Sequence, residues 1–287
     1  MSTNDRVSIT ITDGIADVRL DRADKRNALD NEMFVAIAEA GERLKTEPGV
    51  RVVVLSGNGP SFCAGLDFSS FRTMAGADEP GSDGDGTRSD DGDGLERVSN
   101  GDGPGSMKAG RITHLGQQVA WAWQEVPVPV IAAVHGHALG GGIQIALGAD
   151  IRIVHPDTKL SVREVHWGLV PDMTGTQVLS GLVRPDIAKE LTFTARVFSG
   201  TEALRLGIAT RLSDTPLDDA MAMAGEIAQR SPDAIRGAKA LFNRIVNAGA
   251  AEQFAEERRV IGSLIGRPNQ VEAVTSNFEN RAAKFVD

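Results

Sequence analysis

The chain has 287 residues, of which 41% are hydrophobic and 24% charged, and its formal net charge is −9. This composition is typical of a soluble globular protein with one large domain, or with a core and a smaller appendage. The single cysteine excludes an internal disulfide and a thiolate-clustered zinc site, and we expect no metal. No apolar run approaches the roughly 20 residues of a membrane span. Because the N-terminus also lacks the profile of a secretion signal, we predict a cytoplasmic location and no membrane partner.

The acidity is concentrated in residues 75–105, which hold nine acidic and two basic residues, a net charge of −7. The rest of the chain is nearly neutral, so we do not expect a nucleic-acid partner. The segment is rich in glycine and almost lacks large apolar side chains. It cannot bury enough apolar surface to offset the entropy lost on ordering, so we predict a flexible insertion.

The first half of the chain alternates strand patterns with helical patterns. Residues 7–21 alternate polar and apolar side chains around Asp13-Gly14, which predicts a hairpin, and residues 28–45 have helical spacing with a cap at Asp30. Buried strands are predicted at 50–57, 129–138 and 151–155, and helices at 112–126 and within 140–150. Strands that alternate with helices predict a layered α/β body whose strands are connected through crossovers.

From about residue 184 the pattern becomes helical. Helices are predicted over 184–195, 200–207, 216–230, 231–247, 250–266 and 269–285. Their apolar faces need a partner, either the α/β body or another subunit.

Two glycine turns follow buried strands, one at Gly140, Gly141 and Gly142 and the other in SFCAGLDFSSF (61–71). A helix N-terminus offers unpaired backbone N–H groups, and glycine lets a ligand approach the backbone closely. Such turns also serve close packing, and the first turn alone does not separate the two uses. Together, two such turns could give one carbonyl oxygen two backbone donors, which is the geometry of an oxyanion hole.

Five motifs, in register over nearly the whole chain, resemble the crotonase superfamily of enoyl-CoA hydratases and isomerases. They are DRADKRNALD (21–30), VRVVVLSGNGPSFCAGLDF (50–68), AVHGHALGGGIQIALGADIRI (133–153), LSVREVHWGLVPDMTGTQVL (160–179) and FSGTEALRLGIAT (198–210). The resemblance implies an α/β fold with a spiral of ββα units over residues 1–197. It also implies a helical trimerisation region over residues 198–287, with trimers often paired into hexamers. The implied substrate is an acyl-CoA thioester, with no further cofactor.

The resemblance also implies binding residues by position. The thioester oxygen would be held by the backbone N–H groups of Leu66 and Gly141. The nucleotide of CoA would lie beside four residues of two segments, Lys25, Arg26, Ala28 and Ala64, although the two cations also suit a solvated loop. Many relatives reach a neighbouring subunit's CoA with a Lys just before an Arg, and Asn280-Arg281 departs from that pattern.

Three positions decide the chemistry. Once the thioester carbonyl is polarised, moving a proton or adding water requires a carboxyl group whose pKa is near the working pH. Hydratases that resemble this chain carry glutamates at the positions of Gln144 and Glu164, and an amide cannot take a proton from water. Asp172 stands where many hydratases have glycine. The spacing of Glu164 and Asp172 is similar to that of dienoyl-CoA isomerases, which carry a third acid at the position of Gln144.

We therefore interpret Glu164 and Asp172 as catalytic, with Gln144 in a supporting role, and predict an isomerase that shifts a double bond of an enoyl- or dienoyl-CoA. An enoyl-CoA hydratase that uses Asp172 remains an alternative. A non-catalytic acyl-CoA-binding protein is a second alternative, which Gln144 favours and Glu164 disfavours. Structural interpretations also stay open, since Glu164 could form a cap or an ion pair and Asp172 could cap the following helix.

Overall fold

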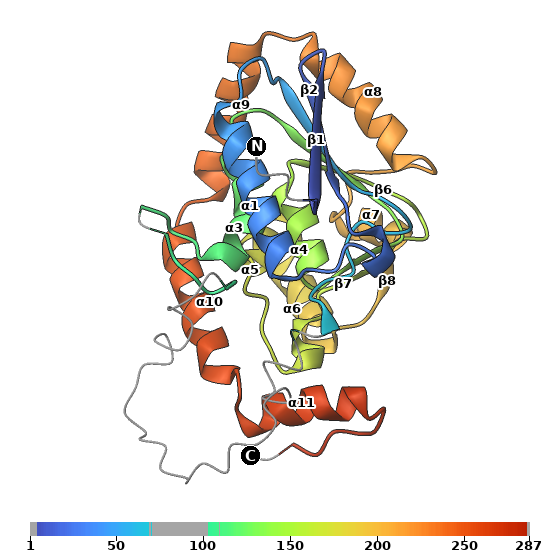
Figure 1. Ribbon diagram of the computed structural model, residues 1–287, viewed down its shortest axis with the longest axis vertical. Helices are drawn as coiled ribbons and strands as arrows, with labels where there is room; N and C mark the ends of the chain where they lie inside the picture. The colour runs from blue at the N-terminus through green and yellow to red at the C-terminus, as the bar shows by residue number, and fades with distance from the viewer. Residues whose placement is uncertain (1–4, 69, 71–102, 109, 286–287) are drawn as a thin grey trace.

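The computed structural model describes residues 5–68, 70, 103–108 and 110–285 (Figure 1). Apart from residues 103–105, the insertion predicted at 75–105 lies outside the described residues. The described part is an α/β body built on two sheets, which confirms the fold class expected from the alternating patterns.

The larger sheet has six strands in the order β1-β2-β3-β4-β6-β9. These strands are β1 (Val7–Thr12), β2 (Ile15–Leu20), β3 (Val52–Gly57), β4 (Val130–Val134), β6 (Ile151–Val154) and β9 (Arg211–Leu212). β1 and β2 form the predicted hairpin and pair antiparallel, and the remaining neighbours are parallel. Every residue of β4 is buried because both faces of the sheet are covered by helices.

The smaller sheet contains β5 (His137–Leu139), β7 (Lys159–Ser161) and β8 (Phe198–Ser199). The sequence pattern indicated one strand over 129–138, and that prediction was wrong, because β4 and β5 belong to different sheets. The chain bends at Gly136, whose φ is +64°, and a Cβ there would lie 2.0 Å from the backbone oxygen of Pro60. Only glycine fits this bend, which directs β5 towards the turn at Cys63.

Helices cover both faces of the larger sheet. On one side lie α1 (Asn31–Thr46), α3 (Leu115–Glu125) and α4 (Gly141–Gly148), and on the other side α8 (Pro216–Ala228) packs against β3, β4 and β6. The predicted cap of α1 is present, since the Asp30 side chain accepts a hydrogen bond from the Met33 N–H.

The later helices follow the predicted order. They are α5 (Gly175–Leu182), α6 (Pro185–Thr194), α7 (Gly200–Leu206), α9 (Pro232–Val246), α10 (Ala250–Leu264) and α11 (Pro268–Phe278). Figure 1 shows α10 running down one side of the body to α11, which crosses its lower end. Because β8, β9 and α8 pack into the body, residues 198–228 are part of it. The oligomerisation role of residues 198–287 stays a prediction. In the described part of the chain, no helix combines the length and the apolar character needed to cross a membrane.

Candidate active site

A cavity of about 620 Å³ opens where the two glycine turns meet. Three of its walls come from the short helical turn η1 (Ala23–Lys25) with the residues after it, the turn at 64–68 and the β5–α4 junction. The short helical turn η2 (Glu164–Trp167), the segment that joins it to α5, and α10 form the others. Eight of the nine site residues expected from the sequence line this cavity: Lys25, Arg26, Ala28, Ala64, Leu66, Gly141, Glu164 and Asp172. Gln144 does not line it.

The turn after β3 is held against β5 by backbone hydrogen bonds. Cys63 N–H donates to the His137 oxygen at 2.9 Å, and Leu139 N–H donates to the Cys63 oxygen at 3.2 Å. A Cβ on Gly142 would lie only 2.2 Å from the same Cys63 oxygen, so α4 can begin here only with glycine. The close approach brings the N-terminus of α4 beside the 63–67 turn.

Two backbone donors face the cavity without a partner. Within the residues that the structure describes, neither the Leu66 N–H nor the Gly141 N–H forms a hydrogen bond. An ideal Cβ on Gly65 would lie 3.9 Å from the Gly141 nitrogen, which places the two turns side by side. Gly140 has φ +52° and ψ −119°, a combination that glycine adopts readily. Two unpaired donors at one wall of a cavity can bind one polarised oxygen.

The loop that carries Lys25 and Arg26 is fixed by Asn27, a residue that the sequence analysis did not single out. Asn27 is fully buried with φ +56°, and its side-chain amide donates to the backbone oxygens of Asn58 at 3.0 Å and Ser61 at 2.8 Å. Asparagine tolerates this left-handed conformation better than most residues, which was the signal available in the sequence.

Glu164 is 8% exposed, and the two oxygen atoms of its carboxylate differ in their surroundings. Oε1 accepts a hydrogen bond of 2.6 Å from Gln144 Nε2, whereas Oε2 is buried and has no hydrogen-bond partner among the residues that the structure describes. Burial disfavours the charged form and raises the pKa of Glu164 from 4.5 to about 7. Near neutral pH this carboxyl group can therefore either accept or donate a proton.

Asp172 is the second carboxyl group of the cavity wall, and it is partly exposed. Desolvation is the largest influence on it, and the negative charges of Glu164 and Glu257 act in the same direction. Together they raise the pKa of Asp172 from 3.8 to about 8. Both carboxyl groups therefore keep a proton to higher pH than ordinary acids do, and because they interact, the pair can hold one proton and accept another near neutral pH.

Both the oxygen and the nitrogen of the Gln144 side-chain amide form hydrogen bonds. Its Oε1 accepts hydrogen bonds from the backbone N–H groups of Met173 at 3.0 Å and Gly175 at 2.9 Å, just where α5 begins. Its Nε2 donates to Glu164. The side chain is 1% exposed, so it supports Glu164 from behind rather than holding a water molecule in the cavity.

We expect Asp172→Asn to stabilise the fold increasingly as the pH rises. A carboxyl group whose pKa is about 8 in the folded protein and 3.8 ordinarily is protonated in both states at low pH. Between these values the unfolded chain loses the proton and the folded chain keeps it, so the native protein loses stability at up to about 1.4 kcal/mol per pH unit. Urea unfolding at pH 5 to 8 measures this, and a stability difference that is independent of pH would contradict it.

We expect Gln144→Glu to shift the pH optimum upwards without creating a water-activating pair. The new carboxylate would stand 2.6 Å from Glu164 Oε1, so one proton would be shared and loss of the last proton would require a higher pH. Activity is measured against pH beside Gln229→Glu, an exposed control. A gain in hydration at unchanged optimum would show that position 144 reaches the substrate.

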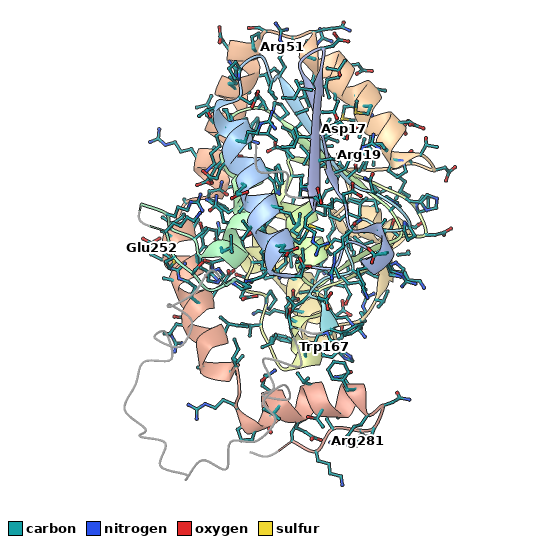
Figure 2. The ribbon with its side chains drawn as sticks, in the orientation of Figure 1. Asp17, Arg19, Arg51, Trp167, Glu252 and Arg281 are labelled. Carbon is teal, nitrogen blue, oxygen red and sulfur yellow. The ribbon has the colours of Figure 1, made fainter. Side chains whose placement is uncertain are left out.

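Part of the cavity wall is apolar and includes Phe68 and Trp167. Trp167 lies between the body and α11 (Figure 2), with its ring centroid 5.9 Å from that of Phe68 and 6.1 Å from that of Phe278. Ile261 and Ile265 add side chains from the end of α10. Such a wall suits an aliphatic chain.

Two further polar features were not anticipated. Ser61 Oγ lies 2.9 Å from His137 Nδ1, but Ser61 is fully buried and cannot reach a substrate. Glu257 is a buried carboxylate behind Asp172, and nothing in the sequence distinguished it from its helical neighbours. Among the described residues, no group of three His, Cys, Asp or Glu side chains could hold a metal ion.

The chain belongs to the enoyl-CoA hydratase/isomerase family, because the profile of that family matches residues 15–286. Crotonyl-CoA hydratase of Syntrophomonas wolfei is 28% identical over 275 residues, 95% of this chain and 94% of that protein. The peroxisomal Delta(3,5)-Delta(2,4)-dienoyl-CoA isomerase of Arabidopsis thaliana is 33% identical over 270 residues, 93% and 91% of the two chains.

The fold is that of solved structures in the same family. The crystal structure of an enoyl-CoA hydratase/isomerase from Mycobacterium paratuberculosis superimposes with a TM-score of 0.79 at 21% identity, covering 96% of this chain and 100% of that one. The resemblance to the crotonase superfamily is therefore confirmed, and the protein is assigned to a family of acyl-CoA-processing enzymes.

Proposed function

We propose that the protein shifts a double bond of an enoyl- or dienoyl-CoA by proton transfer between two carbons. The observation that carries this proposal is the pair of carboxyl groups, Glu164 and Asp172, that line one cavity and whose pKa values are both raised, chiefly by burial. The third acid position is an amide that is held by backbone donors and does not line the cavity.

In this reaction Glu164 removes a proton from one carbon of the acyl chain. Its Oε2 atom, which has no hydrogen-bond partner among the described residues, is the proton acceptor. The electron pair of the broken C–H bond moves into the conjugated system, and negative charge develops on the thioester oxygen. The N–H groups of Leu66 and Gly141 stabilise this charge.

Asp172 then delivers its proton to a second carbon of the extended enolate, and the double bond forms at its new place. No atom other than hydrogen is exchanged, and the two acids end with their protonation states reversed. Proton exchange with solvent resets them. The raised pKa of Asp172 supports this role. An aspartate of ordinary pKa would be ionised at neutral pH and would have no proton to donate.

We assign the binding of the other parts of the substrate to residues that line the cavity. Lys25 and Arg26 attract the phosphates of CoA, and the two segments that carry Ala28 and Ala64 accommodate the nucleotide. The wall around Trp167 binds the acyl chain. We also propose a homotrimer or a dimer of trimers, which the exposed apolar side chains of α9 support: Leu241, Phe242, Ile245 and Val246. A cytoplasmic location stays a prediction from composition.

Hydration of a trans-2-enoyl-CoA is the second candidate. It is favoured by the unpartnered Oε2 of Glu164, which could bind a water molecule, and by relatives named enoyl-CoA hydratase. It is disfavoured because Gln144 offers no second activating group in the cavity. Binding of acyl-CoA without catalysis is a third candidate, which the raised pKa values do not favour.

Product analysis with three substrates tests the proposal. A 3-enoyl-CoA and a 3,5-dienoyl-CoA should return isomers of unchanged mass, and the dienoyl product should gain absorbance from its longer conjugation. A trans-2-enoyl-CoA should be hydrated far more slowly. Formation of 3-hydroxyacyl-CoA as the dominant product would establish hydration instead, and binding with no product from any substrate would establish a binding protein.

A further inference from the structure

Glu257 on α10 is a buried carboxylate that the proposed reaction does not use. It is 4% exposed and accepts three hydrogen bonds. The donors are Thr176 Oγ1 at 2.5 Å, Gln117 Nε2 at 3.1 Å and the backbone N–H of Thr174 at 3.2 Å. Two of these three donors belong to the short segment that carries Asp172.

That segment is strained. Thr174 has φ +69°, in the left-handed region that a β-branched residue rarely adopts, and its buried hydroxyl has no partner in the described part of the chain. Such a conformation persists only where the surroundings impose it. Here the three successive N–H groups of Met173, Thr174 and Gly175 all donate to side-chain oxygens, the middle one to Glu257 and its two neighbours to Gln144.

Glu257 is itself oriented from the other side. Arg258 Nη1 donates to Gln117 Oε1 at 2.8 Å, which leaves Gln117 Nε2 to donate to Glu257. Because all three partners of Glu257 are donors or can act as donors, the contacts favour its ionised form. Burial raises the pKa of Glu257, and these donors oppose that shift by stabilising a negative charge directly behind the Asp172 segment.

The charged and titratable groups around Glu257 come from four elements. Asp172 precedes α5, Glu164 lies on η2, and Arg258 is its neighbour on α10. His114 caps α3, and burial lowers its pKa to about 4, so it is neutral at pH 7. Among these groups Arg258 is the cation, and it is half-buried and directed to Gln117.

We propose that Glu257 is a positioning residue for the proton donor: it fixes the 172–176 segment in its strained conformation and keeps a negative charge behind Asp172. The proposal rests on the proposed function for its catalytic consequence, but the placement and the charge can be tested without any reaction. The negative charge opposes ionisation of Asp172 and adds to the effects of burial and of Glu164 in raising its pKa.

Two variants separate the charge from the contacts. Glu257→Gln keeps the size and one acceptor oxygen but removes the charge, whereas Glu257→Asp keeps the charge and withdraws it by one methylene. Glu256→Gln is the matched control, because Glu256 is exposed on the same helix and forms an ion pair with Arg259. Each variant is compared with the native protein by thermal melting, kcat, KM and the pH profile of kcat.

The direct readout is the titration of Asp172 in the ligand-free protein, followed by carbon NMR of the aspartate carboxyls and assigned with Asp172→Asn. In Glu257→Gln we expect its midpoint, and the alkaline limb of the kcat profile, to move to lower pH. In Glu257→Asp we expect kcat to fall about 10- to 100-fold with little change in KM, because a small misplacement of a reacting group can cost about 100-fold.

An unchanged Asp172 midpoint in Glu257→Gln would overturn the charge assignment, and a native kcat in Glu257→Asp would overturn the positioning. If Glu257→Gln does not fold, the Glu257→Asp result still decides the positioning. If the native protein hydrates rather than isomerises while the midpoint moves as expected, the proposed function fails and the role of Glu257 stands.

Discussion

We expect Glu164→Gln to lower kcat by about 100- to 10 000-fold and to leave acyl-CoA binding nearly unchanged. The loss is of the size expected when a positioned acid–base group is removed. Binding persists because the donors at Leu66 and Gly141 belong to the backbone, and an amide at position 164 keeps the volume of the side chain. Steady-state kinetics and calorimetric titration with a saturated acyl-CoA measure the two quantities.

Glu39→Gln serves as the control, because Glu39 is exposed on α1 and does not line the cavity. It should behave as the native protein in both measurements. A kcat of Glu164→Gln within about threefold of the native value would exclude Glu164 as the proton acceptor, since even weak general-base contributions exceed that factor.

We expect Gly142→Ala to lower kcat/KM by about 100-fold or more and to destabilise the fold. The added methyl group would lie 2.2 Å from the Cys63 backbone oxygen, so either α4 or the 63–67 turn must move. Because one oxyanion donor stands on each side of that contact, the movement separates them, and losing one such donor costs about 100- to 1000-fold. Overpacking adds about 1–3 kcal/mol of destabilisation.

Gly225→Ala provides a matched control for this substitution. Gly225 lies within α8, and a Cβ there would have nothing within 4 Å. Alanine is favoured over glycine in a helix by about 1 kcal/mol, so the control should be at least as stable as the native protein. Native melting temperature and kcat/KM in Gly142→Ala would contradict the close contact between the two turns.

The parts of the fold that could be predicted are those governed by local patterns. The hairpin at Asp13-Gly14, the buried strands and the six late helices all follow from periodicity, turn residues and caps. The break between β4 and β5 could not be predicted in this way, because the apolar pattern continues through it. What separates the strands is the contact of Gly136 with Pro60, which is 76 residues away in the chain.

In the candidate site, too, features within a continuous motif could be predicted, whereas contacts between distant segments could not. Glycine turns and the acids Glu164 and Asp172 lie in motifs that are continuous in the sequence, and the cavity brings them together. Gln144 was expected to support catalysis, and it donates a hydrogen bond to Glu164 while it accepts hydrogen bonds from the backbone N–H groups of Met173 and Gly175. Glu257 gave no signal at all, because only the folding of α10 places it behind Asp172.

The position of deuterium in the product is the most direct test of proton transfer by Glu164 and Asp172 between two carbons. The native enzyme is incubated in deuterated water with a 3-enoyl-CoA, and the recovered acyl chain is analysed by NMR beside the product of Asp172→Asn. We expect an isomerised product from the native enzyme with deuterium at the carbon that receives the proton, and no added hydroxyl group. We expect Asp172→Asn to exchange the abstracted hydrogen without moving the double bond. A 3-hydroxyacyl product from the native enzyme, or full isomerisation by Asp172→Asn, would contradict the two-acid mechanism.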